Sequence, residues 1–328
     1  MRVSESSPRS AVADADRRAW QVTPPRAALA WAAAAVGPRA QVRAVRRLGF
    51  GIAQATHAVT IDDVAGHRHR LVLQRWIRPN WEVEDPGFEP AKEAVVLAAI
   101  GGGRVPVPQV VAVDPDGAAS GAPALLTSRL PGRPPSDRFT ARPSTMDVLG
   151  STIPEIHRLG AGLADRPDLR AIVPAYSPFG NLERAVVPAR TARPDLWAEA
   201  LRVAATNVPA GRPQTLLHRD FHPGNTLWVG DTLSGVVDWS SASWGPPAAD
   251  LAHLRIDVLA RTSLDAAVHA RTAYTRAGGD LTDARRHQLR TVFDYLTDAD
   301  PFVTSAPVVA RLDAFLAIVL EEPDAPDR

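Results

Sequence analysis

The feature that most constrains this 328-residue chain is a short predicted hairpin with polar residues at its base. Residues 226–229 (TLWV) and 235–237 (GVV) are apolar and β-prone, and a Gly-Asp pair after the first of them is typical of a turn. Two strands joined in this way lie side by side. Asn225, just before the first strand, should therefore lie close to Asp238, just after the second.

A second carboxylate, that of Asp220, lies in a loop five residues before Asn225, and the intervening Pro-Gly pair can fold this loop back toward the hairpin. Mg²⁺ prefers carboxylate and amide oxygens together with phosphate and water. In phosphoryl transfer the ion neutralises nucleotide phosphates, while a separate carboxylate orients the attacking hydroxyl and accepts its proton. These three side chains therefore suit a phosphotransferase site.

Composition argues against several other classes of protein. The chain has no cysteine, which excludes disulfides, thiolate nucleophiles and zinc–cysteine sites. The only lysine is Lys92, in the sequence PAKEA, so the glycine-lysine loop of P-loop NTPases is absent. The formal net charge is +1 and the basic residues are scattered, so we expect no nucleic-acid partner.

No membrane segment is expected either. The longest apolar stretch, residues 27–36, has about half the length that spans a bilayer. The N-terminal residues contain no apolar core of a signal peptide. We therefore expect a cytoplasmic protein without membrane contact, and the sequence does not indicate its oligomeric state.

Two domains of different secondary structure are predicted after a polar, flexible arm at residues 1–20. The first, 21–130, should contain helices at 25–36 and from Pro90 to about 100, and strands at 42–45, 55–61, 70–76, 110–113 and 124–127. A Pro-rich segment at 130–135 marks the junction. The second domain, 131–328, should be mostly helical, with helices near 144–160, 193–205, 247–275 and 282–297.

Residues 215–251 resemble the catalytic and metal-binding loops of the aminoglycoside phosphotransferase family. The enzymes of this family are relatives of the protein kinases. The family pattern is His-x-Asp, four residues, Asn, and then a hydrophobic strand that ends in Asp. His218, Asp220, Asn225 and Asp238 match it in order. Trp239, the later Gly-Pro-Pro at residues 245–247 and the Asp-Leu at residues 250–251 also resemble the family. The resemblance covers roughly residues 42–275.

The resemblance implies an α+β, protein-kinase-like bilobal fold. A small N-terminal lobe would hold an antiparallel sheet and a helix and bind ATP, and a larger, mainly helical lobe would bind a small-molecule hydroxyl acceptor. Asp220 would be the catalytic base, and Asn225 and Asp238 would bind Mg²⁺. His218 would buttress the loop, and Asp250 would cap or anchor the following helix.

The same resemblance gives nucleotide-binding roles to the first half of the chain. Gly49 and Gly51 match the glycine loop that covers the phosphates. Glu93 is the candidate for the helix glutamate that pairs with a basic residue of the third strand. Ser128 and Leu130 lie at the position of the hinge that contacts adenine through its backbone.

The basic residue of the third strand departs from the family pattern. Gln74 stands where a lysine or arginine is expected, and Arg75 follows it. Adjacent strand residues point to opposite faces, so a β-bulge would be needed to turn Arg75 toward the phosphates. We favour Arg75 in this role and expect such a bulge. If Gln74 faces the phosphates instead, a neutral amide replaces the usual ion pair.

Three other functions remain open. Gln74 motivates a noncatalytic, nucleotide-binding relative that acts through a partner. His218 and His222, together with Asp220 and Asp238, could instead form a metal-dependent hydrolase. A protein kinase fits less well, because a helix is predicted soon after Asp238 and leaves no room for a long activation segment.

The acceptor is not specified by any motif. The resembling family includes enzymes that act on aminoglycosides, macrolides, amino alcohols and sugars. An acidic cleft would favour a polycationic aminoglycoside. The candidate carboxylates are Asp195, Glu199, Asp257, Asp294, Asp298 and Asp300.

Overall fold

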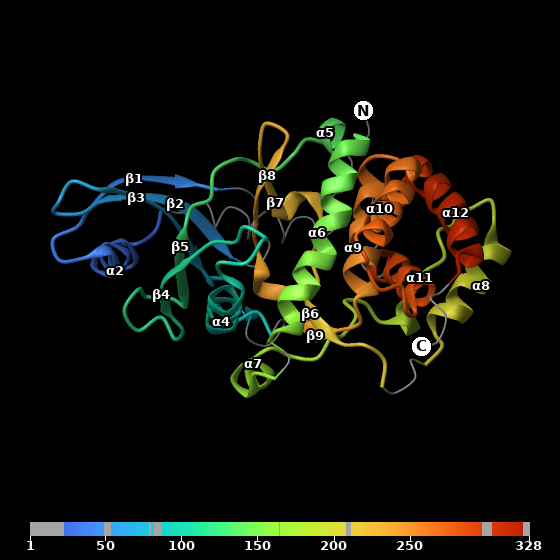
Figure 1. Cartoon of the computed structure of the whole chain (residues 1–328), viewed down its shortest axis with the longest axis horizontal. Coiled ribbons are helices and arrows are strands. Elements are labelled where there is room, and N and C mark those ends of the chain that lie inside the picture. The colour runs from blue at the N-terminus through green and yellow to red at the C-terminus, as the bar shows by residue number, and fades with distance from the viewer. Residues whose placement is uncertain are drawn as a thin grey trace, which may run out of the picture. The chain divides into compact units, whose positions relative to one another are not determined.

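A computed structural model describes residues 23–48, 54–78, 80–81, 87–163, 165–207, 211–296 and 304–323. The chain divides into two compact units (Figure 1). The first comprises residues 1–101 and 108–130, and the second comprises 102–107 and 131–328. The arm predicted at residues 1–20 lies outside the described residues.

The first unit contains a five-stranded antiparallel sheet with the strand order β1-β2-β3-β5-β4. Its strands are β1 (Gln41–Arg47), β2 (Ala55–Asp62), β3 (Arg68–Arg75), β4 (Val110–Asp114) and β5 (Ala124–Ser128). The unit also contains the helices α2 (Arg26–Val36) and α4 (Pro90–Ile100). This mixed sheet and helix arrangement agrees with the predicted α+β class.

Helix α2 packs on one face of this sheet. Its buried Ala28 and Ala32 join a core cluster with alternate residues of the strands, including Leu71 and Leu73 of β3. Because alternate residues of a strand share a face, Arg75 also belongs to the face that α2 covers.

The second unit is mostly helical (Figure 1). Its longer helices are α6 (Pro143–Ala161), α8 (Pro194–Ala204), α9 (Ala248–Arg261), α10 (Leu264–Arg276), α11 (Ala284–Leu296) and α12 (Ala306–Glu321). Shorter helical segments are α5 (Asp137–Thr140), α7 (Pro167–Ile172), η1 (Leu182–Arg184), η2 (Pro223–Asn225) and η3 (Trp239–Ser241). Two small antiparallel ribbons complete it, β6 (Thr215–Leu217) with β9 (Ser243–Gly245), and β7 (Thr226–Val229) with β8 (Thr232–Val236).

The single helix predicted at 247–275 is wrong, because the structure contains two helices there. Thr262 leaves the helical conformation, with φ −125° and ψ −90°. The Ser263 hydroxyl then caps α10 by accepting a hydrogen bond from the Ala266 N–H at 3.2 Å. A serine at this position satisfies a backbone donor that a new helix would otherwise leave unpaired. Helix α12 was not predicted at all.

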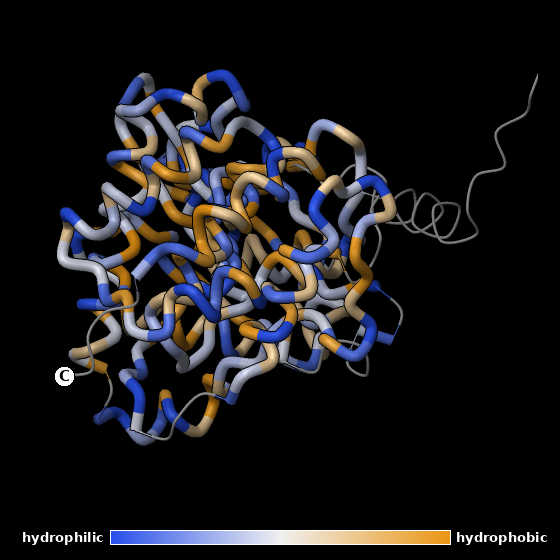
Figure 2. Tube along the Cα trace, turned by 90° about the vertical axis from the view of Figure 1, so that its right-hand side faces the viewer, coloured by the Kyte–Doolittle hydropathy of each residue, from blue (hydrophilic) through white to orange (hydrophobic). Residues whose placement is uncertain are grey.

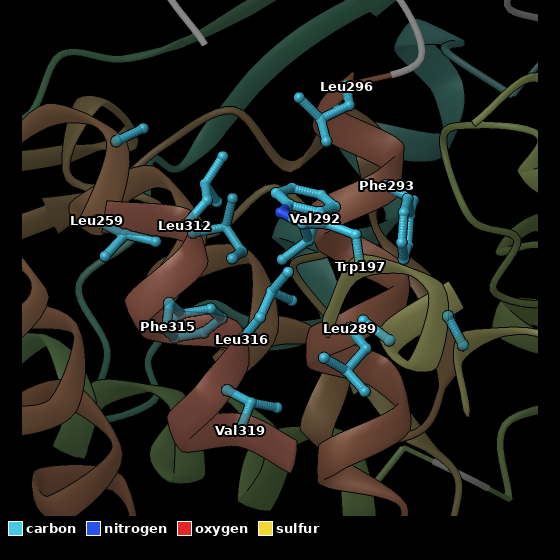
Figure 3. Close-up of a cluster of buried hydrophobic side chains, with 14 of the residues drawn as sticks. Trp197, Leu259, Leu289, Val292, Phe293, Leu296, Leu312, Phe315, Leu316 and Val319 are labelled. Atoms are coloured by element: carbon cyan, nitrogen blue, oxygen red, sulfur yellow. The ribbon is translucent and has the colours of Figure 1, made fainter. Parts of the chain in front are cut away.

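The core of the helical unit lies among α8, α9, α11 and α12 (Figure 3). Trp197 packs edge-on against Phe293, with ring centroids 5.8 Å apart, and its indole N–H donates to Asp313 at 2.6 Å. Figure 2 shows hydrophobic and hydrophilic residues alternating along the chain trace, as expected where helices have one buried side. Among the described residues, no helix has both the length and the apolar character needed to cross a membrane.

Candidate active site

The β7–β8 hairpin brings Asn225 and Asp238 to the same end of one ribbon. Thr226 pairs with Val236 in the antiparallel register. One step further, the Val237 N–H donates to the Asn225 carbonyl at 2.9 Å. The predicted hairpin and the proximity that follows from it are therefore confirmed, although β8 begins at Thr232, earlier than predicted.

Two residues of the site have left-handed backbones, Arg219 with φ 69° and Asp238 with φ 65°. This conformation costs about 1–3 kcal/mol for a residue other than glycine, so the surrounding contacts must impose it. At Arg219 the contact is with Asp250, whose carboxylate accepts the N–H groups of His218 at 3.1 Å and Arg219 at 2.7 Å.

Asp250 therefore anchors the loop and does not cap its own helix, contrary to the expected cap. Its side chain makes no capping hydrogen bond at the start of α9 and is fully buried. His157 of α6 supports the same carboxylate, with Nε2 3.1 Å from Oδ2.

Asp220 is held through both carboxylate oxygens. Oδ1 lies 2.9 Å from Nε2 of His253, and Oδ2 accepts from the Asn225 amide at 3.1 Å. His222 lies further away, with Nε2 3.8 Å from Oδ2. Burial alone would raise the pKa of Asp220, but the hydrogen bond and charge of His253, with smaller contributions from neighbouring histidines, hold it below its usual range. The carboxyl is therefore ionised near neutral pH.

Asp238 is half-buried and lies close enough to Asp220 for their charges to interact. Its Oδ1 accepts from the Ser240 hydroxyl at 2.6 Å. Burial and then the negative charge of Asp220 raise the pKa of Asp238 above its usual range. Two carboxylates that repel one another, beside an amide oxygen, form a donor set that suits a hard divalent cation such as Mg²⁺. Within the described part of the chain, no donor is bonded to Oδ1 of Asn225, which leaves this oxygen available as a ligand.

His218 has the contacts of a buttress. It is fully buried, its Nε2 lies 3.0 Å from the Val237 carbonyl, and its ring centroid lies 4.6 Å from that of Trp239. Burial lowers the pKa of His218 despite the nearby carboxylates, so the ring stays neutral. The described residues contain no group of three or more His, Asp or Glu side chains arranged to hold a metal.

The bulge expected near Arg75 is absent, which corrects the preference for Arg75 as the phosphate-binding cation. β3 pairs with β2 and with β5 without a register shift up to Arg75. Arg75 is 4% exposed on the face that α2 covers, and burial lowers its pKa. Gln74 lies on the opposite face and donates to the Gln54 amide oxygen at 2.7 Å.

The other predicted nucleotide-binding residues either lie in the first unit or are outside the residues that the structure describes. Glu93 is buried in the first turn of α4, beside the equally buried Lys92. Gly49 and Gly51 lie outside the described residues. Their roles, and that of Glu93, stay predictions.

The two hinge candidates differ in their backbone contacts. The Ser128 N–H already donates to the Gln109 carbonyl at 2.8 Å. Leu130 makes no backbone hydrogen bond with another described residue. The Ser128 N–H is thus occupied, and the hinge role of both residues stays a prediction.

Two residues near Asp220 were missed by the sequence reasoning. His253 lies on α9 three residues after Asp250, a spacing that places both on one helix face and could have been noticed. Phe179 is 52% exposed, with its ring 6.0 Å from that of His253 and under the Arg219 guanidinium at 4.0 Å. It lies in an irregular segment, where no sequence periodicity could have marked it.

Most of the chain is similar to proteins of a known enzyme family. A model of the phosphotransferase enzyme family matches residues 44–290. Homoserine kinases of Brucella anthropi and Brucella ovis are each 30% identical over 141 residues, 42% of this chain and 41% of the relative. The matched region thus spans about two fifths of the length of these curated relatives.

Solved structures show the same fold at low identity. Macrolide 2'-phosphotransferase MphH from Brachybacterium faecium superposes with a TM-score of 0.55 at 19% identity, over 90% of this chain and 98% of that one. A thermostable mutant of aminoglycoside phosphotransferase APH(4)-Ia, in complex with ADP and hygromycin B, gives 0.53 at 18% identity, over 86% and 96%. These likenesses confirm the predicted fold.

Proposed function

Because the chain belongs to the phosphotransferase enzyme family, we propose that it transfers the γ-phosphate of ATP to a hydroxyl group of a small molecule. The observation that carries the proposal is the convergence of Asp220, Asn225 and Asp238 at one end of the β7–β8 hairpin, with Asp220 ionised and held.

In this proposal Asn225 and Asp238 hold Mg²⁺, which neutralises the nucleotide phosphates when bound. The oxygen donors of both residues suit this ion. The raised pKa of Asp238 supports the assignment, since repulsion from Asp220 is what a divalent cation would relieve.

Asp220 orients the acceptor hydroxyl and receives its proton. The hydroxyl oxygen bonds to the γ-phosphorus as the bond to the β–γ bridging oxygen breaks, and the proton passes to the Asp220 carboxylate. Because catalysis of phosphoryl transfer depends mainly on positioning and electrostatics, the main task of Asp220 is to orient the hydroxyl, and its ionised carboxylate can accept the hydrogen bond that this requires.

The nucleotide would be bound through the first unit. Structurally similar proteins are described in complex with ADP and with GDP, which supports a nucleotide as donor. We propose that Gly49 and Gly51 cover the phosphates and that Leu130 contacts the adenine. Gln74, facing away from α2, would then meet the phosphates with a neutral amide, which predicts slow transfer.

The acceptor class follows from the charges of the helical unit. Asp257 is paired with Arg261 at 3.0 Å, Asp294 with Arg290 at 2.9 Å, and Glu199 with Arg202 at 2.6 Å. These pairings leave little unbalanced negative charge on those carboxylates for a polycation. They support a neutral or zwitterionic acceptor, and the homoserine kinase relatives support a small amino alcohol. Asp298 and Asp300 lie outside the described residues.

The test is a transfer assay with Mg²⁺ and γ-labelled ATP against homoserine, other amino alcohols, sugars, macrolides and aminoglycosides. We expect label on a neutral or zwitterionic acceptor with the native protein, and none with Asp220→Asn, which keeps the shape of the side chain but removes the base. Intact transfer by this variant would refute the role of Asp220.

A second candidate function, noncatalytic nucleotide binding, is favoured by Gln74 alone. It predicts that Mg·ATP binds, as measured by calorimetry, while no acceptor of the panel is labelled. Transfer to any acceptor would exclude it.

A further inference from the structure

One turn of α9 holds three consecutive residues of the loop that carries the proposed base, His218, Arg219 and Asp220. The Asp250 carboxylate accepts the N–H groups of His218 and Arg219. His253, on the same helix face, reaches the side chain of Asp220, with 2.9 Å between Nε2 and Oδ1. The loop backbone and the carboxylate at its end are thus fixed by the same rigid element.

The imidazole of His253 is itself held in place. Its side chain is 9% exposed. The Tyr295 hydroxyl lies 3.3 Å from Nε2, and the rings of Phe179 and His222 lie 6.0 Å and 5.9 Å away. Because a carboxylate can only accept, Nε2 must carry the proton that faces Asp220. A packed imidazole of this kind can fix a carboxylate in one orientation.

We propose that His253 is a positioning residue for the phosphoryl transfer, which fixes Oδ1 of Asp220 while Asn225 fixes Oδ2. The proposal rests on the proposed function of this site. His253 neither gains nor loses a proton in the transfer, since the proton of the acceptor hydroxyl passes to Asp220. It acts by stopping rotation of the carboxylate.

Two features explain why this contact matters. Each carboxylate oxygen has more than one acceptor position, so the donors from His253 and Asn225 leave room for the acceptor hydroxyl. Burial opposes the charged imidazole, but the hydrogen bond and charge of Asp220 raise the pKa of His253 above its usual value. The contact is therefore charge-assisted, which makes it a strong constraint.

The transfer assay compares His253→Ala and His253→Gln with the native protein, using an acceptor labelled in the panel. A misplacement of about 1 Å costs about 100-fold in rate, so we expect kcat of His253→Ala to fall about 10- to 100-fold with KM for ATP unchanged. His253→Gln should recover most of this loss, because its amide N–H can occupy the place of Nε2–H. His269→Ala is the matched control, since it removes a histidine that contacts Asp147 at 2.8 Å on the exposed surface. It should leave kcat unchanged.

Unchanged kcat in His253→Ala, or equal losses in both His253 variants with native unfolding midpoints, would overturn the proposal. A second measurement does not need transfer. In protein with ¹⁵N-labelled histidine, the Nε2–H resonance of His253 should show a hydrogen bond in the native protein and lose it in Asp220→Ala, which removes the acceptor. If the native protein transfers no phosphate, the proposed function fails, and this resonance alone decides the contact. Its absence from the native protein would overturn the inference.

Discussion

Gln74 is the residue whose chemistry most limits the rate expected of this protein. It is neutral, half-buried and hydrogen-bonded to Gln54, on the sheet face opposite α2. Replacing it with lysine places a cation on that face without changing the strand. Since a positioned donor near developing charge contributes about 100-fold or more, Gln74→Lys should raise kcat by at least about 10-fold.

The matched control for this change is the next residue of β3. Arg75→Gln alters the face that α2 covers and should leave the transfer rate unchanged. A loss of transfer in Arg75→Gln, with no gain in Gln74→Lys, would show that Arg75 serves the phosphates after all. The assay is the initial rate of label transfer at saturating ATP.

His287 makes the stability of the protein sensitive to acid. Its side chain is 2% exposed beside the ring of Tyr176, and neither of its ring nitrogens has a hydrogen-bond partner among the described residues. Burial, assisted by the charge of Arg286, lowers the pKa of His287 to about 4. The unfolded chain, with a histidine pKa of about 6.5, therefore binds a proton that the folded chain does not.

Between pH 6.5 and about 4 this difference lowers the free energy of unfolding by up to about 1.4 kcal/mol per pH unit as the pH falls. Above pH 6.5 the contribution is complete. His287→Leu should flatten the pH dependence within this window, as measured by urea unfolding between pH 4.5 and 7. Identical slopes for the two proteins would show that His287 titrates normally in the folded state.

The residues of the site differ in how far the sequence could reveal them. Asp220, Asn225 and Asp238 lie close together along the chain, so local strand and turn signals place them near one another. His253 reaches Asp220 from a helix far along the sequence, and only the packing of α9 under the loop creates this contact. The regular pairing of β3 could not be read from its sequence, because a bulge leaves little signal in a pattern of alternating residues.

Helix α12 is fastened to the helical unit by a buried ion pair at its C-terminal end. Arg255 of α9 is fully buried and donates to both carboxylate oxygens of Glu322, each at 2.9 Å. Arg271 approaches the same carboxylate at 3.5 Å. Because removal of one partner leaves a buried charge uncompensated, Glu322→Gln should lower the free energy of unfolding by about 3–5 kcal/mol.

Urea unfolding measures this loss, and Glu199→Gln is the control. The pair of Glu199 with Arg202 is exposed on one helix, so this substitution should cost less than about 1 kcal/mol. A double change of Arg255→Met with Glu322→Leu should recover much of the loss, because the fully buried charge of Arg255 is removed together with its partner. If Glu322→Gln were as mild as the control, α12 would be held by its apolar contacts alone.

The helices and strands with regular periodicity were predicted well, and the exceptions have local causes. The break between α9 and α10 depends on Thr262 and on the cap by Ser263, since the apolar pattern continues across it. A prediction from periodicity alone therefore joins the two helices into one. The pairing of β7 with β8 is predicted by the sequence, but the predicted second strand begins three residues later than β8.

The division of the whole chain was only partly visible in its sequence. The Pro-rich segment suggested one junction near residue 130, but the structure counts residues 102–107 with the second unit. This short segment is flanked on both sides by residues of the first unit, and its glycines and proline indicate a loop but not the unit to which it belongs. Tertiary contacts alone assign it.

Magnesium and nucleotide together should stabilise the whole protein. A ligand at 100 times its Kd stabilises the folded state by about 2.7 kcal/mol, so Mg·ATP should raise the thermal midpoint by several degrees. EDTA should abolish the shift, and so should Asp238→Asn, which removes a proposed Mg²⁺ ligand. A shift that persists in this variant would show that nucleotide binds without the metal site. Differential scanning calorimetry provides the measurement.

Acylation of the buried Lys92 can report local opening of the first unit. Acylating reagents attack an uncharged, accessible amine, and this chain offers only Lys92 and its α-amino group. In the native fold the Lys92 side chain is sheltered on α4, so its acylation waits for the first unit to open. The helical unit contains no lysine and stays silent. The rate at which doubly acylated protein appears, measured by mass spectrometry, therefore reports how often the first unit opens.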